Sequence, residues 1–176
     1  MKSTSIQNIT KIAMFAAIIA VCSLISIPLP SGIPVTLQTF AIALAGFSLG
    51  LKNGTISVAV YLAIGAVGVP VFSGLTGGFA KLFGVTGGYL WGFLGMAALC
   101  GLAVNKNKIL TVVLSVLGLA LCHGFGSLQF AFISGSSPLQ SFMIASAPYL
   151  IKDIVSMAFA YTIALAIQKA LSLRRA

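Results

Sequence analysis

Six apolar runs, separated by short polar or glycine-rich segments, divide the chain. A helix needs roughly 20 residues to cross a hydrocarbon core about 30 Å thick. On that measure the pattern predicts six membrane-spanning helices, although five or seven would also fit, at residues 10–28, 35–51, 55–72, 85–104, 109–134 and 147–170. Lys52-Asn53-Gly54 predicts a tight turn between the second and third spans. We therefore expect an all-α integral membrane protein, a bundle forming a single transmembrane domain over residues 1–176.

The composition agrees with this class. Hydrophobic residues make up 59% of the chain and charged residues 6%, whereas about a quarter of the residues in a soluble domain are charged. The net charge is +9, but the basic residues stand singly or in pairs between apolar runs. This spacing excludes the continuous basic surface of a nucleic-acid-binding protein. The three cysteines lie inside apolar runs without metal-ligand spacing, so no metal site is expected.

The distribution of the basic residues predicts the orientation in the membrane. Cytoplasmic loops carry an excess of lysine and arginine, and eight of the ten basic residues fall on one side of the predicted spans: Lys2, Lys11, Lys52, Lys106, Lys108, Lys169, Arg174 and Arg175. We expect a multi-pass plasma-membrane protein with both termini in the cytoplasm. Three outward loops, at 29–34, 73–84 and 135–147, are then placed where they could close over a ligand.

Residues 61–93 form the most unusual stretch, because it is rich in both glycine and aromatic residues and its one charge is Lys81. It predicts a helix, a folded-back loop and a second helix that opens at Gly87-Gly88-Tyr89. Glycines also recur every fourth residue. Tight helix packing is the favoured explanation for the stripe at Gly46, Gly50 and Gly54. For Gly84 and Gly88 we favour a ligand role, because Thr86, Tyr89 and Trp91 gather beside them. The lysine of a phosphate-binding P-loop is missing, so this segment builds no ATP site.

Asp153 is the single acidic residue of the chain and lies near the outer start of the last span. An ionisable residue at membrane depth is costly and is by default a functional candidate. The alternative is a structural ion pair with Lys152 or Lys81, although adjacent residues of a helix do not face one another. Ser156 shares a helix face with both Asp153 and Lys152, so the three offer an acceptor, a hydroxyl and a cation to a polar ligand.

Two other polar residues lie within or beside apolar runs. His123 interrupts the fifth span, where a kink or break is expected, and it is interpreted as a hydrogen-bonded structural residue rather than a proton relay. Gln38 lies at the start of the second span. It could cap the bundle or contact the ligand, and the sequence favours neither role. The sequence contains no serine–histidine–acid set and no second carboxylate for acid–base work, so enzymatic catalysis is not expected.

Small residues mark one strip of the first span. They recur four residues apart and allow close approach of helices in a membrane, at Ala13, Ala16, Ala17 and Ala20. Packing inside the bundle and docking onto another membrane subunit are equally compatible with this strip.

Several motifs, in order over nearly the whole chain, resemble the BioY family, the biotin-binding S components of energy-coupling factor (ECF) transporters. They are PVTLQ at 34–38, Tyr61 with GVPVF at 68–72, GVTGGY at 84–89 followed by Gly92-Phe93, and Pro148-Tyr149 with Asp153. None of these motifs alone is specific for the family, but the combination of motifs at these spacings is.

The resemblance implies six membrane helices and a biotin site near the outer face. It also implies a transmembrane coupling subunit and a pair of cytoplasmic ATPases as partners, with ATP hydrolysed only there and no cofactor on this chain. By position, Gly87, Gly88 and Tyr89 would line the pocket, and Asp153 would accept from the ureido N–H groups of biotin. Lys81 is a candidate partner for the carboxylate of biotin, and the alanine strip resembles the surface that meets the coupling subunit.

The sequence departs from the family pattern at three positions. Val85 replaces the usual proline, Ser156 replaces a lysine three residues after the aspartate, and Gln129 stands where an aromatic residue is expected. The function expected from the resemblance is high-affinity capture of biotin outside and delivery inward. The rivals are an S component for another vitamin or a biotin precursor and a self-sufficient oligomeric facilitator, with a membrane-embedded enzyme acting through His123 as a distant third.

Overall fold

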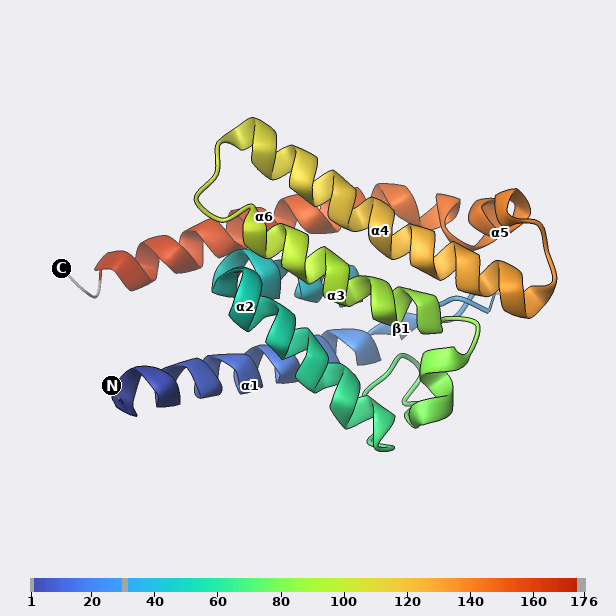
Figure 1. Ribbon diagram of the computed structural model, residues 1–176, viewed down its shortest axis with the longest axis horizontal. Coiled ribbons are helices and arrows are strands. Elements are labelled where there is room, and N and C mark those ends of the chain that lie inside the picture. Colours follow the sequence, from blue (N-terminus) through green and yellow to red (C-terminus); the bar gives the residue numbers. More distant parts are fainter. Residues whose placement is uncertain (1, 30–31, 174–176) are drawn as a thin grey trace.

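The structure is a computed structural model that describes residues 2–29 and 32–173, and nearly all of its elements are helices aligned along one long axis (Figure 1). The α-helices are α1 (Lys2–Leu24), α2 (Gln38–Ala66), α3 (Gly87–Leu102), α4 (Lys108–Ser134), α5 (Pro138–Ala145) and α6 (Leu150–Leu173). Two short 3-10 helices, η1 (Phe79–Phe83) and η2 (Ala147–Tyr149), lie in the connections. A small antiparallel hairpin joins α1 to α2 through strands β1 (Ser26–Ile27) and β2 (Val35–Thr36).

The expectation of a helical membrane protein agrees with the lengths of these helices. Within the described residues, four helical stretches are long and apolar enough to cross a membrane, namely Ser5–Leu24, Gln38–Ala66, Lys108–Ser134 and Pro138–Ala170. Helix α3 is apolar but shorter, with 16 residues. The predicted count of six spans is therefore not confirmed by length alone.

Helix α2 contains a sharp break, which lies slightly earlier in the chain than the turn predicted from the sequence. Gly50 has φ 76° and ψ 179°, a conformation open essentially to glycine alone, and it divides α2 into two arms. The predicted turn at Lys52-Asn53-Gly54 is wrong, because these residues already belong to the second arm. Gly54 serves close packing instead, since a Cβ there would lie 2.9 Å from the carbonyl oxygen of Ala45. Packing was the use expected for this glycine stripe.

Helix α4 is continuous, so the predicted kink between His123 and Gly126 is also wrong. Gly126 has a different purpose, because a Cβ at that position would overlap the ring of Tyr89 on α3. The glycine therefore lets an aromatic side chain lie directly against the backbone of α4. In the predicted outer loop at 135–147 the structure has an additional helix, α5, which is capped at its start by the side chain of Ser137.

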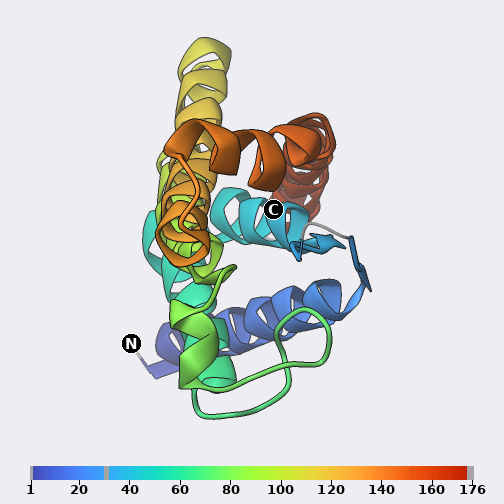
Figure 2. The ribbon, with the colours of Figure 1, turned by 90° about the vertical axis from the view of Figure 1, so that its right-hand side faces the viewer.

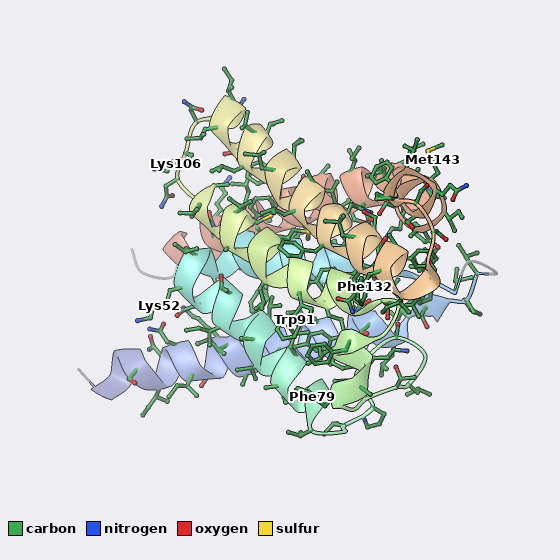
Figure 3. The ribbon with its side chains drawn as sticks, turned by 45° about the vertical axis from the view of Figure 1, so that its right-hand side comes forward. Lys52, Phe79, Trp91, Lys106, Phe132 and Met143 are labelled. Carbon is green, nitrogen blue, oxygen red and sulfur yellow. The ribbon has the colours of Figure 1, made fainter. Side chains whose placement is uncertain are left out.

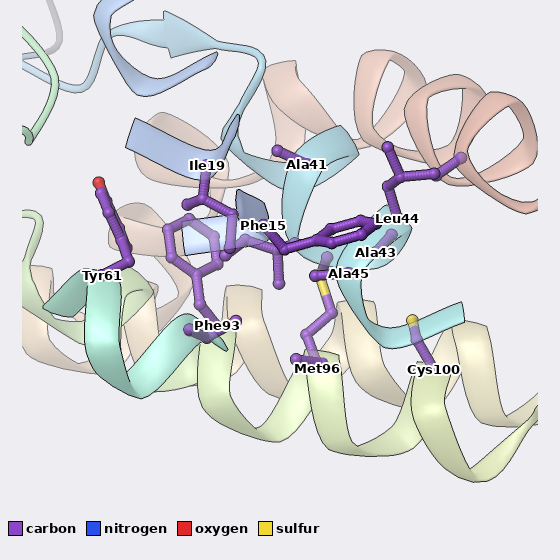
Figure 4. Packing of buried hydrophobic residues seen from close by; sticks show 14 of the residues in the cluster. Phe15, Ile19, Ala41, Ala43, Leu44, Ala45, Tyr61, Phe93, Met96 and Cys100 are labelled. Atoms are coloured by element: carbon purple, nitrogen blue, oxygen red, sulfur yellow. The ribbon is translucent and has the colours of Figure 1, made fainter. Parts of the chain in front are cut away.

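The hydrophobic core lies where α1, the first arm of α2 and α3 meet. Figure 4 shows Phe15 and Ile19 of α1 facing Phe93 and Met96 of α3, with a run of alanines of α2 beside them. The small alanine side chains, Ala41, Ala43 and Ala45, are fully buried. Close approach of this arm to its neighbours is what small residues permit in a membrane bundle.

The two ends of the bundle differ in character. The first turn of α1 and the last turn of α6 lie at one end, and Figure 3 shows Lys52 and Lys106 there as well. The hairpin, η1 and α5 gather at the opposite end, which Figure 2 views directly. We refer to this second end as the loop end. Arg174 and Arg175, as well as residues 30 and 31 of the first predicted loop, lie outside the described residues.

Candidate functional site

A cavity of about 60 Å³ opens at the loop end, among segments that are distant in sequence. Its walls come from the hairpin and the start of α2, from η1, from the start of α3, from the middle of α4 and from the first turn of α6. The cavity is lined by six of the residues that the sequence singled out as site candidates: Gln38, Lys81, Thr86, Tyr89, Lys152 and Asp153. The fold therefore brings most of the predicted site together.

Asp153 lies in the first turn of α6, and its side chain is only 5% exposed. The N-terminus of a helix carries partial positive charge and stabilises an anion there. The carboxylate is also paired across the bundle, because its Oδ2 lies 3.2 Å from Nε2 of His123 on α4. Thr39 at the start of α2 adds a side-chain hydrogen bond. The charge of this buried carboxylate is therefore compensated by groups from three helices.

Lys152 forms an ion pair with Asp153, with its Nζ on Oδ1. The expectation that these neighbours would not pair is wrong. The helical-face argument applies to short side chains, whereas the long stem of lysine bends around the first turn of α6. The same Nζ donates to the carbonyl oxygen of Thr36, 2.9 Å away. Lys152 thus links the carboxylate on α6 to strand β2, and it faces the cavity.

Gln38 holds the start of α2 in place and also lines the cavity. Its Nε2 donates to the Tyr61 hydroxyl at 2.9 Å, and its Oε1 accepts from the Thr36 hydroxyl at 3.0 Å. The Tyr61 hydroxyl in turn donates to Ser23 of α1 at 3.1 Å. Both ends of the Gln38 amide therefore serve the bundle, and a contact with the ligand stays a prediction.

Tyr89 of α3 and Lys81 of η1 also line the cavity. The Tyr89 hydroxyl lies 2.9 Å from Oγ of Ser146, and its ring meets the ring of His123 edge-on with centroids 5.9 Å apart. Lys81 projects from η1 and is half-buried. The chain has one acidic residue, which is already paired with Lys152 and His123. Lys81 therefore has no acidic side chain with which to pair.

Three predicted site residues are not among those lining the cavity: Gly87, Gly88 and Ser156. A Cβ at Gly88 would lie 2.7 Å from the carbonyl carbon of Phe125, and one at Gly87 would lie 2.5 Å from the Gln129 amide. The backbone of Leu82 in η1 lies closer still to a Cβ at Gly87. Packing of α3 against α4 thus requires glycine at Gly88, and packing of α3 against η1 requires it at Gly87, without any ligand. Ser156 is buried on α6, one turn further from the loop end. Contact of these three with a ligand stays a prediction.

Gln129, which stands where the family resemblance led us to expect an aromatic residue, fastens η1 to α4. Its Nε2 donates to the carbonyl oxygens of Leu82 at 3.2 Å and Gly84 at 2.8 Å. The Trp91 indole also donates to the Leu82 oxygen, at 3.1 Å. The segment that carries Lys81 is therefore attached to the bundle by side-chain hydrogen bonds on both flanking helices.

The alanine strip of α1 borders a hollow of its own, of about 290 Å³, between α1 and the second arm of α2. All four alanines line it, together with Val60 and Ile64. Ala16 is buried, whereas Ala13 and Ala17 are exposed. Part of the strip thus serves internal packing, and the rest leaves a shallow apolar surface. Docking of another subunit onto this surface stays a prediction.

Sequence reasoning missed the pairing of His123 with Asp153. A signal was present, because the chain has one histidine and one acid, both within apolar runs. A buried charge needs a partner, so the two could have been matched. The hydrogen bond predicted for His123 is present. Its Nδ1 is buried without a hydrogen-bond partner among the described residues. Polar groups of this site are therefore not all satisfied by the described part of the protein itself.

Comparison with known proteins gives one consistent result. The BioY family model matches residues 1–173. The probable biotin transporter BioY of Pyrococcus horikoshii is 35% identical over 158 residues, which cover 90% of this chain and 94% of that protein. The biotin transporter BioY of Thermotoga maritima is 35% identical over 165 residues, covering 93% and 96%. A crystal structure of the S component for biotin from an ECF-type ABC transporter matches with a TM-score of 0.86 at 27% identity, covering 96% and 94%.

Proposed function

The chain belongs to the BioY family, and from this membership we propose that it is the biotin-binding membrane subunit of an ECF-type uptake transporter. The chain captures biotin at the loop end and delivers it to the inside of the cell. The free energy for this transport comes from ATP hydrolysed on partner subunits. It is a transport subunit and not an enzyme. The observation that carries the proposal is the buried Asp153 carboxylate on the wall of the loop-end cavity.

Asp153 receives the ureido group of biotin in this proposal. A ureido group offers two parallel N–H donors, and a carboxylate offers two oxygens with about four lone-pair sites. Lys152, His123 and Thr39 already contact the carboxylate, so one of these sites stays free for a ureido N–H and a second N–H would take the place of one of these partners. These partners hold the carboxylate in a fixed orientation. Charge-assisted hydrogen bonds of this kind are about twice as strong as neutral ones.

Lys81 receives the carboxylate tail of biotin. It lines the same cavity from η1, on a segment distinct from Asp153. Its charge has no acidic side chain of the chain to pair with, because Asp153 is taken. A ligand with donors at one end and an anion at the other therefore matches the two charged groups of the cavity.

Capture requires the loop end to move. A cavity of about 60 Å³ has room for only a handful of water molecules, so a bicyclic ligand is admitted when the surrounding segments separate. The segment most suited to this is η1, whose hydrogen bonds to α3 and α4 are made by the Leu82 and Gly84 carbonyls. Loops and short helices that open for a ligand usually belong to the less stable parts of a fold.

The topology that accompanies this function has six crossings, formed by α1, the two arms of α2, α3, α4 and α6. The ends of α1 and α6 and the lysines at positions 52 and 106 share one end of the bundle. We place that end in the cytoplasm on the positive-inside rule. The transmembrane coupling subunit of the ECF module then meets the exposed alanines of α1, beside the hollow described above.

Equilibrium binding of biotin to the purified chain in detergent tests the proposal. Asp153→Asn removes the charge from one hydrogen-bond partner, which should cost about 1.5–3 kcal/mol, roughly ten- to a hundredfold in affinity. Lys81→Gln should weaken binding of biotin but leave binding of its uncharged amide unchanged. Lys52→Gln, at the other end of the bundle, is the matched control and should have no effect. Failure of the unmodified chain to bind biotin would refute the proposed substrate, and unchanged affinity in Asp153→Asn would refute the site.

A further inference from the structure

A long apolar groove lies between α4 and α6, on the half of the bundle away from the loop end. It has a volume of about 480 Å³. The two helices have few contacts with each other, and Figures 1 and 2 show the first turns of α4 standing away from the rest of the bundle. The walls are aliphatic, with Val112, Val116 and Leu119 on α4 facing Ile154 and Met157 on α6.

A second, smaller hollow of about 140 Å³ continues the groove at its basic end. Phe47, Tyr161 and Leu165 line both spaces, so the two adjoin. The aromatic rings of Phe47 and Tyr161 meet edge-on at 5.3 Å and form the junction. Beyond them the lining turns polar, with Lys106 and the Gln168 side chain. The continuous space is therefore apolar along most of its length and polar and cationic at one end.

The length of the groove corresponds to one leaflet of a membrane. Along α4 it runs from Lys108 to Leu119, and at 1.5 Å per residue this is about 16 Å. Half of a hydrocarbon core about 30 Å thick is about 15 Å. Lys108 stands at the mouth of the groove and Lys106 in the adjoining hollow. Both are at the end of the bundle where the lysines cluster, the depth of lipid headgroups.

We propose that this groove binds one acyl chain of an anionic phospholipid, with the headgroup phosphate held by Lys106 and Lys108. The start of α4 adds the partial positive charge of a helix N-terminus at the same place. An amphiphile with an anionic headgroup fits both parts of the space, because its acyl chain matches the apolar groove and its phosphate matches the two lysines. The lipid fills the gap between α4 and α6 beneath the His123–Asp153 pair and so supports the two helices that carry it.

Native mass spectrometry of the chain, released from detergent with added phosphatidylglycerol or phosphatidylcholine, tests the proposal. One phosphatidylglycerol should be retained in preference to phosphatidylcholine. The double variant Lys106→Gln/Lys108→Gln should bind phosphatidylglycerol roughly thirtyfold more weakly, since each lysine near an anionic headgroup is worth about fivefold. Lys52→Gln, a lysine at the same end but outside the groove, should bind it as the unmodified chain does. Equal retention of the two lipids, or no effect of the double variant, would overturn the proposal.

A second variant tests whether an acyl chain occupies the groove. Ala158→Leu places bulk in the groove and should lower lipid retention, whereas Ala166→Leu, on the same helix but lining neither space, should not. The thermal midpoint of each variant, measured alongside, identifies a chain that fails to fold. If Ala158→Leu leaves lipid retention unchanged but dissociates an oligomer of the chain, the groove belongs to a second copy and the lipid proposal is wrong.

Discussion

Replacement of Gly88 by alanine separates the packing role of this glycine from the ligand role that the sequence suggested. A Cβ at this position would lie 2.7 Å from the carbonyl carbon of Phe125 and 2.8 Å from Cβ of Gln129. The nearest atom is backbone of α4, which cannot rotate away, so α3 and α4 must separate. Overpacking of this kind typically costs about 1–3 kcal/mol. At about 2–4 °C per kcal/mol for a chain of this size, the thermal midpoint should fall by several degrees.

Gly95→Ala is the matched control on the same helix. Its Cβ would lie 3.5 Å from a methyl group of Leu121, which is ordinary contact. Alanine also favours the helix by about 1 kcal/mol over glycine, so this variant should be as stable as the unmodified chain or more so. Thermal unfolding in detergent, followed by the fluorescence of Trp91, measures both. If Gly88→Ala kept the stability of the control but lost biotin binding, the packing argument would be wrong and the glycine would be a ligand contact.

Two further substitutions address single features. Gln129→Leu removes two hydrogen bonds to η1, worth about 0.5–1.5 kcal/mol each, and should speed hydrogen exchange at residues 79–84. The control Gln140→Leu, on the exposed surface of α5, should leave that exchange unchanged. Unchanged exchange in Gln129→Leu would contradict the prediction and show that other contacts hold η1. Gly50→Ala forces a side chain into a glycine-only conformation and should lower the free energy of unfolding by about 1–3 kcal/mol. Gly124→Ala, where a Cβ meets open space, should be tolerated, and equal midpoints for these two variants would refute the strain at Gly50.

Much of the candidate site could be predicted from the sequence because its members are marked by chemistry that stands out locally. Asp153 is conspicuous as the one acid in an apolar chain, and Lys81 as the one charge in a glycine-rich stretch. The fold places both on the same cavity. The role of Gly88 could not be decided in this way, because a glycine beside a polar loop looks the same in sequence whether it admits a ligand or a neighbouring helix.

Hydropathy alone determined that this chain is a bundle of apolar helices, because the cost of exposing polar groups to lipid acts on every residue independently. Family motifs and single charged residues, which are also local, located Asp153 near the start of α6. Tertiary structure decided the rest. The partner of Asp153 on α4 is His123, 30 residues away, and the break of α2 lies at Gly50 rather than at the polar turn. Gly126 accommodates Tyr89, and α4 parts from α6 to leave a groove. Each of these features depends on which helices pack against one another. That packing minimises the free energy of the whole bundle, and the sequence of a single segment does not determine it.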